Sequence, residues 1–229
     1  DLALALPPEK LPVVQIKLIE KANDKAVPVI VATQMLLSMV KQRIPTRAEV
    51  SDVSYSVMQG ADAVMLSEET SVGADPVRAV KMMRRIIVEA LSNFNFDQYK
   101  LRLTALGQTN IVEAICYAAA AAGFKLNSRA LVACTTSGYS VRLLSKYRPK
   151  PPVLAYAHSE EVVRRLSLCW GVESVLAEYK ADNDRQERDQ AFEAARRKLN
   201  FRKGDTVILL GGVKTFQIGG TSLMEIRQM

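Results

Sequence analysis

The sequence predicts an α/β protein of two domains, in which strands and helices alternate along the chain. Three observations support this fold class: apolar, often β-branched segments alternate with amphipathic helical segments, polar residues gather where the predicted strands end, and the periodicity breaks over residues 97–109. Such alternation is typical of a parallel sheet or barrel whose site lies at the carboxyl ends of the strands. A chain of 229 residues can form two domains, each with its own core.

The composition excludes several other classes of protein. With 48% hydrophobic, 24% charged and 6% aromatic residues, the chain is neither disordered, collagen-like nor coiled-coil. Its longest apolar runs, such as 27–33 and 116–123, are far shorter than the ~20 residues of a membrane span, so we expect no membrane segment. The first eight residues lack an initiator Met and a basic region, so they do not match a signal peptide, and we expect the chain to begin within a longer sequence.

Cysteine usage indicates a reducing, cytoplasmic setting. The chain has three widely spaced cysteines and no C-x-x-C pair, so neither a disulfide framework nor a zinc site is indicated. All three lie in apolar stretches, where we expect buried free thiols. They are Cys116, Cys134 and Cys169.

The net charge of +7 raises the question of a nucleic-acid partner, and its distribution argues against one. Residues 1–104 carry 13 Lys and Arg against 12 Asp and Glu, whereas residues 105–229 carry 18 against 12. The excess is spread along helices with interleaved acids and without aromatic residues, which favours a solvated helix face over a nucleic-acid groove. Small phosphorylated ligands stay compatible with this charge.

The first half of the chain predicts two strand-helix units. Residues 9–26 have apolar residues at helical spacing, and 29–33 form a β-branched strand that leads into a helix-like segment, 34–41. Thr46 and Glu49 form a capping box for a helix at 48–58. A second strand at 61–66 and a long helix at 77–94 follow.

The second half repeats this alternation with shorter connections and predicts a small α/β sandwich. Helices are expected at 111–123, 140–147, 159–168 and 184–199, and strands at 130–134, 152–155, 174–176, 206–210 and 222–226.

Short motifs in a fixed order give the chain a family resemblance. In the first half they lie at 32–36 (Ala-Thr-Gln-Met-Leu), 45–49 (Pro-Thr-Arg-Ala-Glu), 51–53, 60–62 and 65–70, and in the second at 135–140, 146–149, 203–205 and 219–222. Each motif alone is weak, but this many collinear matches are hard to produce by chance. Together they resemble the second half of pyruvate kinase, over essentially the whole chain.

The resemblance implies a (β/α)8 (TIM) barrel with a small lid domain inserted in its earlier part, followed by a C-terminal α/β domain. This chain would supply the last part of the catalytic barrel, over residues 1–97, and the C-terminal domain for effector binding and assembly, over 105–229. The family's phosphate-contacting arginine, potassium site, lid, catalytic lysine and first metal-binding glutamate all lie upstream of the motif to which Asp1 belongs.

The family's reaction moves a phosphoryl group from phosphoenolpyruvate to ADP in glycolysis and then protonates the enolate to pyruvate. The resemblance therefore implies Mg²⁺ (or Mn²⁺), a K⁺ site outside this chain, a cytoplasmic homotetramer, a phosphorylated effector, and neither nucleic acid nor membrane as partner. Asp1 matches the second metal-binding carboxylate at the substrate site. Thr33 matches a threonine that binds the substrate carboxylate and lies near the enolate carbon, where a hydroxyl suits a proton relay through water.

Both residues also have plain structural interpretations. Asp1 is the first residue of the chain, and the Thr33 hydroxyl could simply cap the following segment. Two departures from the family pattern count against full activity, because Ala3 replaces a glycine and Ala5 replaces a buried acid. We therefore expect the isolated chain to be inactive, and the alternative to a kinase portion is a non-catalytic regulatory or assembly module.

Polar residues at other loops are weaker candidates. Glu68 and Glu69, within the polar run 67–70, could suggest catalytic carboxylates. Adjacent side chains usually diverge, however, so we favour a structural role in which these polar groups form hydrogen bonds to the backbone of the loop. Arg47 resembles a family residue at a subunit contact and is otherwise an exposed arginine. His158 has no visible partner in the sequence and is interpreted as a surface turn residue, and Trp170 as core.

The second candidate site is the segment that links a predicted strand to a helix at 135–140. Its hydroxyls and backbone N–H groups would collect at a helix N-terminus, which is a phosphate-binding geometry. In the family, the matching loop and a late loop, here 211–221 with Lys214, hold a sugar-phosphate effector in regulated members. The alternative is an ordinary turn capped by Ser137. The effector candidates are Thr135, Thr136, Ser137, Gly138, Tyr139, Ser140 and Lys214.

Overall fold

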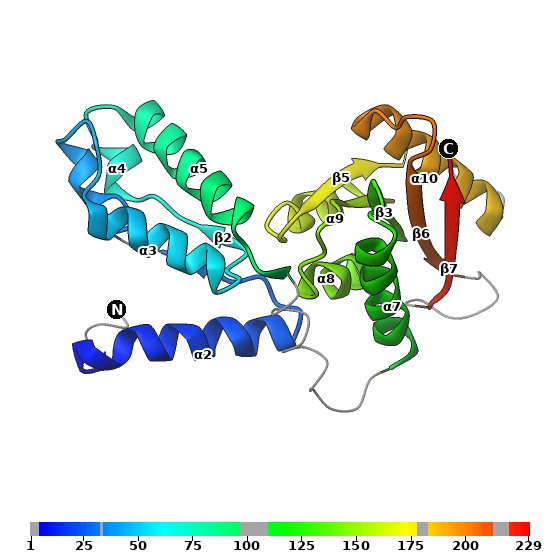
Figure 1. The fold of residues 1–229 in the computed structure, drawn as a ribbon, viewed down its shortest axis with the longest axis horizontal. Helices are drawn as coiled ribbons and strands as arrows, with labels where there is room; N and C mark the ends of the chain where they lie inside the picture. Colours follow the sequence, from blue (N-terminus) through cyan, green and yellow to red (C-terminus); the bar gives the residue numbers. More distant parts are fainter. Residues whose placement is uncertain (1–4, 33, 97–109, 178–182, 213–219) are drawn as a thin grey trace. The chain divides into compact units, whose positions relative to one another are not determined.

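A computed structural model describes residues 5–32, 34–96, 110–177, 183–212 and 220–229 (Figure 1). The chain forms two compact units, residues 1–95 and 96–229. No helix in the described ranges is long and apolar enough to cross a membrane.

The first unit contains two short parallel strands and the helices that follow them. Strand β1 pairs with β2, with Ile30 opposite Ala63 and Val31 opposite Val64. The elements are α2 (Leu11–Asp24), β1 (Ile30–Val31), the 3-10 helix η2 (Leu37–Val40), α3 (Arg47–Met58), β2 (Ala63–Val64), α4 (Glu68–Ser71) and α5 (Pro76–Ser92).

Several of these elements are shorter than the sequence predicts. The predicted strands spanned 29–33 and 61–66, but β1 and β2 pair over only two residues each. Each strand has one neighbouring strand among the described residues, and an isolated pair of strands is short. The expected helix over 34–41 is reduced to η2, because the backbone is not α-helical at Gln34, which is left-handed (φ 55°), or at Leu36 (φ −137°). The capping box is confirmed, since the Thr46 side chain accepts from the Glu49 N–H.

The first unit has a small core and a large exposed apolar surface. The core packs side chains from η2, α3 and α5 around Leu36 and Val53, both fully buried. Outward-facing apolar residues remain on α5, where Val77 is 61% and Val88 55% exposed, and on β1, where Ile30 is 44% exposed. A sheet of two strands leaves its outer edges open, so this unit needs further strands to bury them.

The second unit is a five-stranded sheet with helices on both faces. The strand order is β5-β4-β3-β6-β7, with β7 antiparallel and the other four parallel. The elements are α7 (Ile111–Lys125), β3 (Ala130–Thr135), α8 (Tyr139–Lys146), β4 (Val153–Ala157), α9 (Glu160–Leu166), β5 (Val172–Leu176), α10 (Asp184–Leu199), β6 (Thr206–Gly212) and β7 (Thr221–Gln228). Each agrees with the predicted element to within a few residues.

Alternate residues of the central strands face opposite helix layers. Ala130, Val132 and Leu154 pack against alanines of α10, including Ala191. On the other face α7 approaches β3 closely, because a Cβ at Gly123 would lie 2.9 Å from the Leu131 side chain. Both faces are buried, so the central strands have continuous apolar sequences.

The three cysteines are free, as expected. Cys116 and Cys169 are buried, while Cys134 is partly accessible. Burial is the main cause that raises the pKa of Cys116 and of Cys134 to about 12. Neither of these two thiols therefore ionises appreciably near neutral pH.

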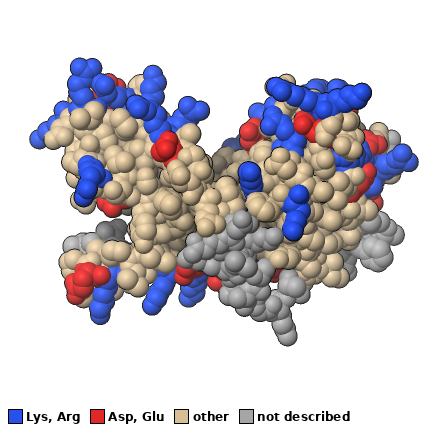
Figure 2. Space-filling view, viewed as in Figure 1, with Lys and Arg blue, Asp and Glu red and all other residues tan. Residues whose placement is uncertain are grey.

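Acidic side chains are interspersed among the basic ones of the second unit (Figure 2). On α10, Arg196 pairs with Glu193 at 2.7 Å, and Arg188 reaches Glu225 of β7 at 3.0 Å. The basic excess of this half is therefore partly neutralised by neighbouring carboxylates.

Candidate functional site

Three of the predicted site residues, Asp1, Thr33 and Lys214, lie outside the described residues. In the sequence, Thr33 comes two residues after β1 ends at Val31. Arg47 is the first residue of α3, and its side chain is exposed. The structure describes the whole 135–140 loop.

Glu69 connects the segments that follow β1 and β2. Its side chain is fully buried; Oε1 accepts a hydrogen bond from the Leu36 N–H at 2.9 Å, and Oε2 accepts one from the Ser67 N–H at 2.8 Å. Glu68, the adjacent acid, is exposed. The two neighbouring carboxylates thus differ in burial, and Glu69 accepts hydrogen bonds from backbone N–H groups of the loops, as the sequence predicted.

Glu49 is a second carboxylate that accepts hydrogen bonds in the segment after β1. Its Oε1 accepts from the Ser38 N–H at 2.6 Å, and Oε2 accepts from the Ser38 hydroxyl at 2.6 Å and from the Thr46 N–H at 2.7 Å. Partial burial raises the pKa of Glu49, but the hydrogen bonds from Ser38 and Thr46 outweigh it and the net shift is downward. The carboxylate therefore joins η2 to the start of α3.

In the second unit, the 135–140 loop uses its own hydroxyls to hold its backbone. Buried Thr135 accepts from the Gly138 N–H at 2.8 Å, and Ser137 accepts from the Tyr139 N–H at 3.4 Å. Gly138 has a left-handed backbone (φ 78°), and a Cβ there would lie 3.2 Å from Leu166. The loop is thus a tight, preformed turn in which two amides already have acceptors.

The same loop lies at the switch point of the sheet. From β3 the chain proceeds through α8 to β4 on one side, whereas β6 is the neighbour of β3 on the other. In open α/β sheets, ligands bind in the crevice outside the carboxyl ends of the strands at such a point. Thr135 ends β3 and Gly212 ends β6, and because these neighbouring strands are parallel, both ends lie at the same edge of the sheet.

His158 has a partner at this edge of the sheet, contrary to the expectation from sequence. Its Nε2 lies 2.7 Å from Glu187 Oε1, and its ring lies edge-on to Tyr156 with 6.2 Å between centroids. His158 follows β4, and α10 packs against that strand, which brings Glu187 close. A contact between residues 29 apart has no sequence signal.

A buried charge cluster links α7 to α8, and sequence reasoning missed it. Lys146, which is 7% exposed, lies 2.5 Å from Glu113 Oε1, and the Tyr147 hydroxyl donates to the same oxygen at 3.3 Å. Burial, followed by the charge of Glu113, raises the pKa of Tyr147 well above its usual range. Lys146 and Tyr147, the first two residues of the motif at 146–149, thus connect the end of α8 to α7.

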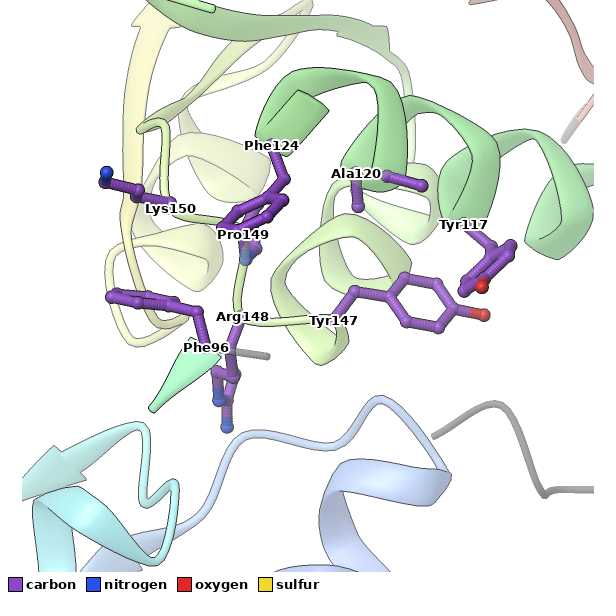
Figure 3. A pocket seen from close by; sticks show the side chains of 9 residues that line it. Phe96, Tyr117, Ala120, Phe124, Tyr147, Arg148, Pro149 and Lys150 are labelled. Carbon is purple, nitrogen blue, oxygen red and sulfur yellow. The ribbon is translucent and has the colours of Figure 1, made fainter. Parts of the chain in front are cut away.

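Next to this cluster is a small pocket rimmed by aromatic rings, including Tyr117, Phe124 and Tyr147 (Figure 3). Arg148 has a left-handed backbone (φ 44°) and is buried; it donates to the Ser145 carbonyl at 2.9 Å. Its guanidinium lies 5.1 Å from the ring centroid of Trp170, a half-buried residue and not a fully buried core residue. The pocket is lined by Phe96, Tyr117, Ala120, Ala121, Phe124, Tyr147, Arg148, Pro149 and Lys150.

The described residues do not by themselves form a metal site. No group of three or more His, Cys, Asp or Glu side chains among them is placed to hold an ion. Near the ends of β1 and β2, the carboxylates of Glu49 and Glu69 are engaged by backbone N–H groups.

The arrangement is that of an α/β protein in which the end of a parallel barrel is followed along the chain by a doubly wound sheet with a strand-helix loop at its switch point. Residues 1–80 match the family model "Pyruvate kinase, barrel domain", and residues 113–227 match "Pyruvate kinase, alpha/beta domain". The chain belongs to the pyruvate kinase family, and this confirms the predicted fold class.

Individual relatives agree with this assignment. Pyruvate kinases of Staphylococcus aureus strains USA300 and N315 are each 40% identical over 226 residues, which is 99% of this chain and 38% of the relative. The crystal structure of a pyruvate kinase from Cryptosporidium parvum superposes with a TM-score of 0.90 at 33% identity, covering 99% of this chain and 45% of that one. The chain thus spans less than half the length of these relatives.

Proposed function

We propose that the polypeptide containing this chain transfers the phosphoryl group of phosphoenolpyruvate to ADP, giving pyruvate and ATP in glycolysis. The observation that carries this proposal is the collinear match of both units to the two pyruvate kinase family models. In this proposal the first unit supplies one side of the substrate site, and the second supplies effector binding and assembly. The free thiols of this chain support a cytoplasmic location.

Thr33 is the proposed catalytic and substrate-binding residue of this chain. Its hydroxyl binds the substrate carboxylate and passes a proton through water to the enolate carbon. Its place in the sequence, two residues after β1, supports this role, because barrel enzymes place their reacting groups after the carboxyl ends of their strands. The hydroxyl can both accept and donate a proton without carrying charge itself.

Metal ions belong to the proposed activity, but the described residues do not form their site. Mg²⁺ or Mn²⁺ would neutralise charge on the phosphate and the enolate. Asp1 is the proposed ligand from this chain, together with groups that lie outside it, and K⁺ would be bound outside it as well. We therefore assign no step of the reaction to a metal held by the described residues.

Thr33→Val in the intact polypeptide tests the catalytic assignment. Removing the hydroxyl should lower kcat by about 100-fold, which lies within the usual contribution of a proton-transfer group, with a smaller change in KM for phosphoenolpyruvate. Val keeps the branched shape and removes only the hydroxyl. Wild-type turnover in the variant would remove Thr33 from the mechanism.

A homotetramer is the proposed assembly, and the edge strand β7 supports association. Its outer edge has no neighbour among the described residues, and it exposes Met224 (38%) and Ile226 (49%). An eight-residue edge strand with outward apolar side chains is a ready surface for another chain. Arg47 is the proposed subunit contact of the first unit.

A non-catalytic regulatory or assembly module is the alternative. The alanines at positions 3 and 5 favour it, because the family pattern has a glycine and an acid there. The matches to the pyruvate kinases, however, cover both units of the chain and not the second unit alone. The two proposals differ in one result, which is turnover of phosphoenolpyruvate by the intact polypeptide.

A further inference from the structure

The pocket of the second unit lies between one face of α7 and the turn that follows α8 (Figure 3). On α7, Tyr117 and Phe124 are separated by about two helical turns and therefore share a face. Ala120 and Ala121 lie between them and also line the pocket. Two alanines between two rings leave the helix surface hollow at this point, and residues 147–150 form the opposite wall.

The wall formed by the turn is held in a strained conformation. The Tyr147 hydroxyl donates a hydrogen bond to Glu113 at 3.3 Å, and its ring meets that of Tyr117 edge-on, with 5.5 Å between centroids. The next residue, Arg148, has a left-handed backbone (φ 44°), although it is not a glycine and precedes a proline. Backbone strain of this kind gathers at ligand clamps and active sites. The strain at Arg148 therefore marks this turn for a functional role.

The Arg148 side chain fixes the turn from inside. Arg148 is 2% exposed, and its guanidinium donates to the Ser145 carbonyl at 2.9 Å and to the Ser145 hydroxyl at 3.2 Å. The guanidinium also lies 5.1 Å from the ring centroid of Trp170. These contacts compensate for the burial of the charge. The wall is thus formed before any ligand arrives, which reduces the conformational entropy lost on binding.

The size and charge of the pocket define the kind of ligand that it fits. Four of its nine lining residues are aromatic, and none is acidic. Its cavity volume of about 20 Å³ exceeds the roughly 10–15 Å³ that one water needs, but excludes a nucleotide or a sugar chain. Lys150 lines the pocket with an exposed side chain, and no carboxylate among the described residues pairs with it. Rings attract a further ring in offset or edge-on contact, and the lysine attracts an anion.

We propose that this pocket binds a small planar aromatic carboxylate, whose ring enters between α7 and residues 147–150 and whose acid group pairs with Lys150. The site is separate from the 135–140 loop. That loop follows the carboxyl end of β3, whereas residues 147–150 precede the amino end of β4, and the two strands are parallel. The proposal does not depend on the proposed kinase activity, because every contact that supports it lies within the second unit.

Three probes that share one ring test the charge preference. Benzoate, benzamide and benzylamine carry a negative, a neutral and a positive group, and each is titrated into the 229-residue chain by protein-observed NMR. Benzoate should bind most tightly and benzylamine least, with the largest shifts at the amides of 117–124 and 147–150. Lys150→Gln should weaken benzoate binding by about fivefold, as for an exposed ion pair, and leave benzamide binding unchanged. Benzamide that binds the wild type as tightly as benzoate would contradict the carboxylate preference.

Filling the hollow tests the location of the ring. Ala121→Leu adds three carbon atoms to a half-buried lining residue and should weaken benzoate binding by about tenfold or more. Ala118→Leu, the same substitution at an exposed position of α7 outside the lining, is the matched control and should bind like the wild type.

A second pocket variant keeps the test decisive if Ala121→Leu does not fold. Phe124→Ala removes one ring of the wall from a side chain that is 36% exposed, and it should also weaken benzoate binding by about tenfold. Equal affinity for benzoate in the wild type and in a folded pocket variant would overturn the proposal. A wild-type chain that shows no shift up to about 10 mM benzoate would overturn it as well.

Discussion

Lys146 of α8 and Glu113 of α7 form an ion pair of 2.5 Å in which the lysine is 7% and the glutamate 20% exposed. Removing one partner of a buried pair leaves the other charge without compensation, so Glu113→Ala should destabilise the second unit by about 3 kcal/mol. Urea unfolding of the chain, followed by a probe in the second unit, measures this loss.

The surface pair of Arg164 and Glu160 provides the control for that measurement. Both side chains are largely exposed, at 68% and 73%, and the pair joins one turn of α9 at 3.0 Å. Glu160→Ala should therefore change the free energy of unfolding by at most about 0.5 kcal/mol. Similar losses for the two variants would show that the α7–α8 pair behaves as a surface pair.

The two units should differ in their ability to fold alone. The five-stranded sheet is covered on both faces, whereas the two-stranded sheet has open edges and exposed apolar neighbours among the described residues. Residues 105–229 should unfold cooperatively in urea, and residues 1–96 should not. A cooperative transition of the 1–96 piece, by circular dichroism and fluorescence alike, would contradict this.

The 135–140 loop should bind a phosphorylated ligand at the switch point. Ser137→Asp puts a negative charge into the proposed site, and loss of a charge-assisted contact weakens binding by about tenfold or more. Calorimetric titration of residues 105–229 with sugar phosphates and nucleoside monophosphates measures this. Asn200→Asp adds the same charge at an exposed position between the end of α10 and the start of β6, at the opposite edge of the sheet, and should leave affinity unchanged. Absence of binding by the unmutated unit would reduce the loop to a structural turn.

Acid should remove the contribution of Glu225 to stability. The hydrogen bond from Arg227 lowers the pKa of Glu225, and Arg188 adds to this against the opposing effect of burial. A carboxyl whose folded pKa is depressed stabilises the fold above its ordinary pKa, and the stabilisation is lost as pH falls through the folded value. The wild type should exceed Glu225→Gln by at most about 1 kcal/mol at pH 7, because the side chain is 33% exposed, and the difference should shrink below pH ~4. A difference that grows in acid would contradict the assignment.

Local features of the fold were predictable from sequence, because they depend on neighbours along the chain. Thr46 and Glu49 lie three residues apart, and their capping box forms as expected. The alternation of apolar strands with helices likewise predicted the elements of the second unit. The extents of β1 and β2 were overestimated, since ladder length depends on partner strands that the local pattern does not reveal.

The candidate site was less predictable, because its contacts join distant residues. Glu69 reaches an amide 33 positions away, and the sequence could say only that it and Glu68 should diverge. The partner of His158 and the Lys146–Glu113 pair, 33 residues apart, also had no sequence signal. Such contacts arise from helix packing and follow from tertiary structure alone.

The proposed kinase activity is tested by a coupled assay of pyruvate formation, with the intact polypeptide and the isolated 229-residue chain compared side by side. We expect turnover of phosphoenolpyruvate and ADP by the intact polypeptide and none by the isolated chain, because the groups that neutralise the transferred phosphate lie outside it. Turnover by the isolated chain that is abolished by Asp1→Ala, or an intact polypeptide without turnover, would contradict this assignment.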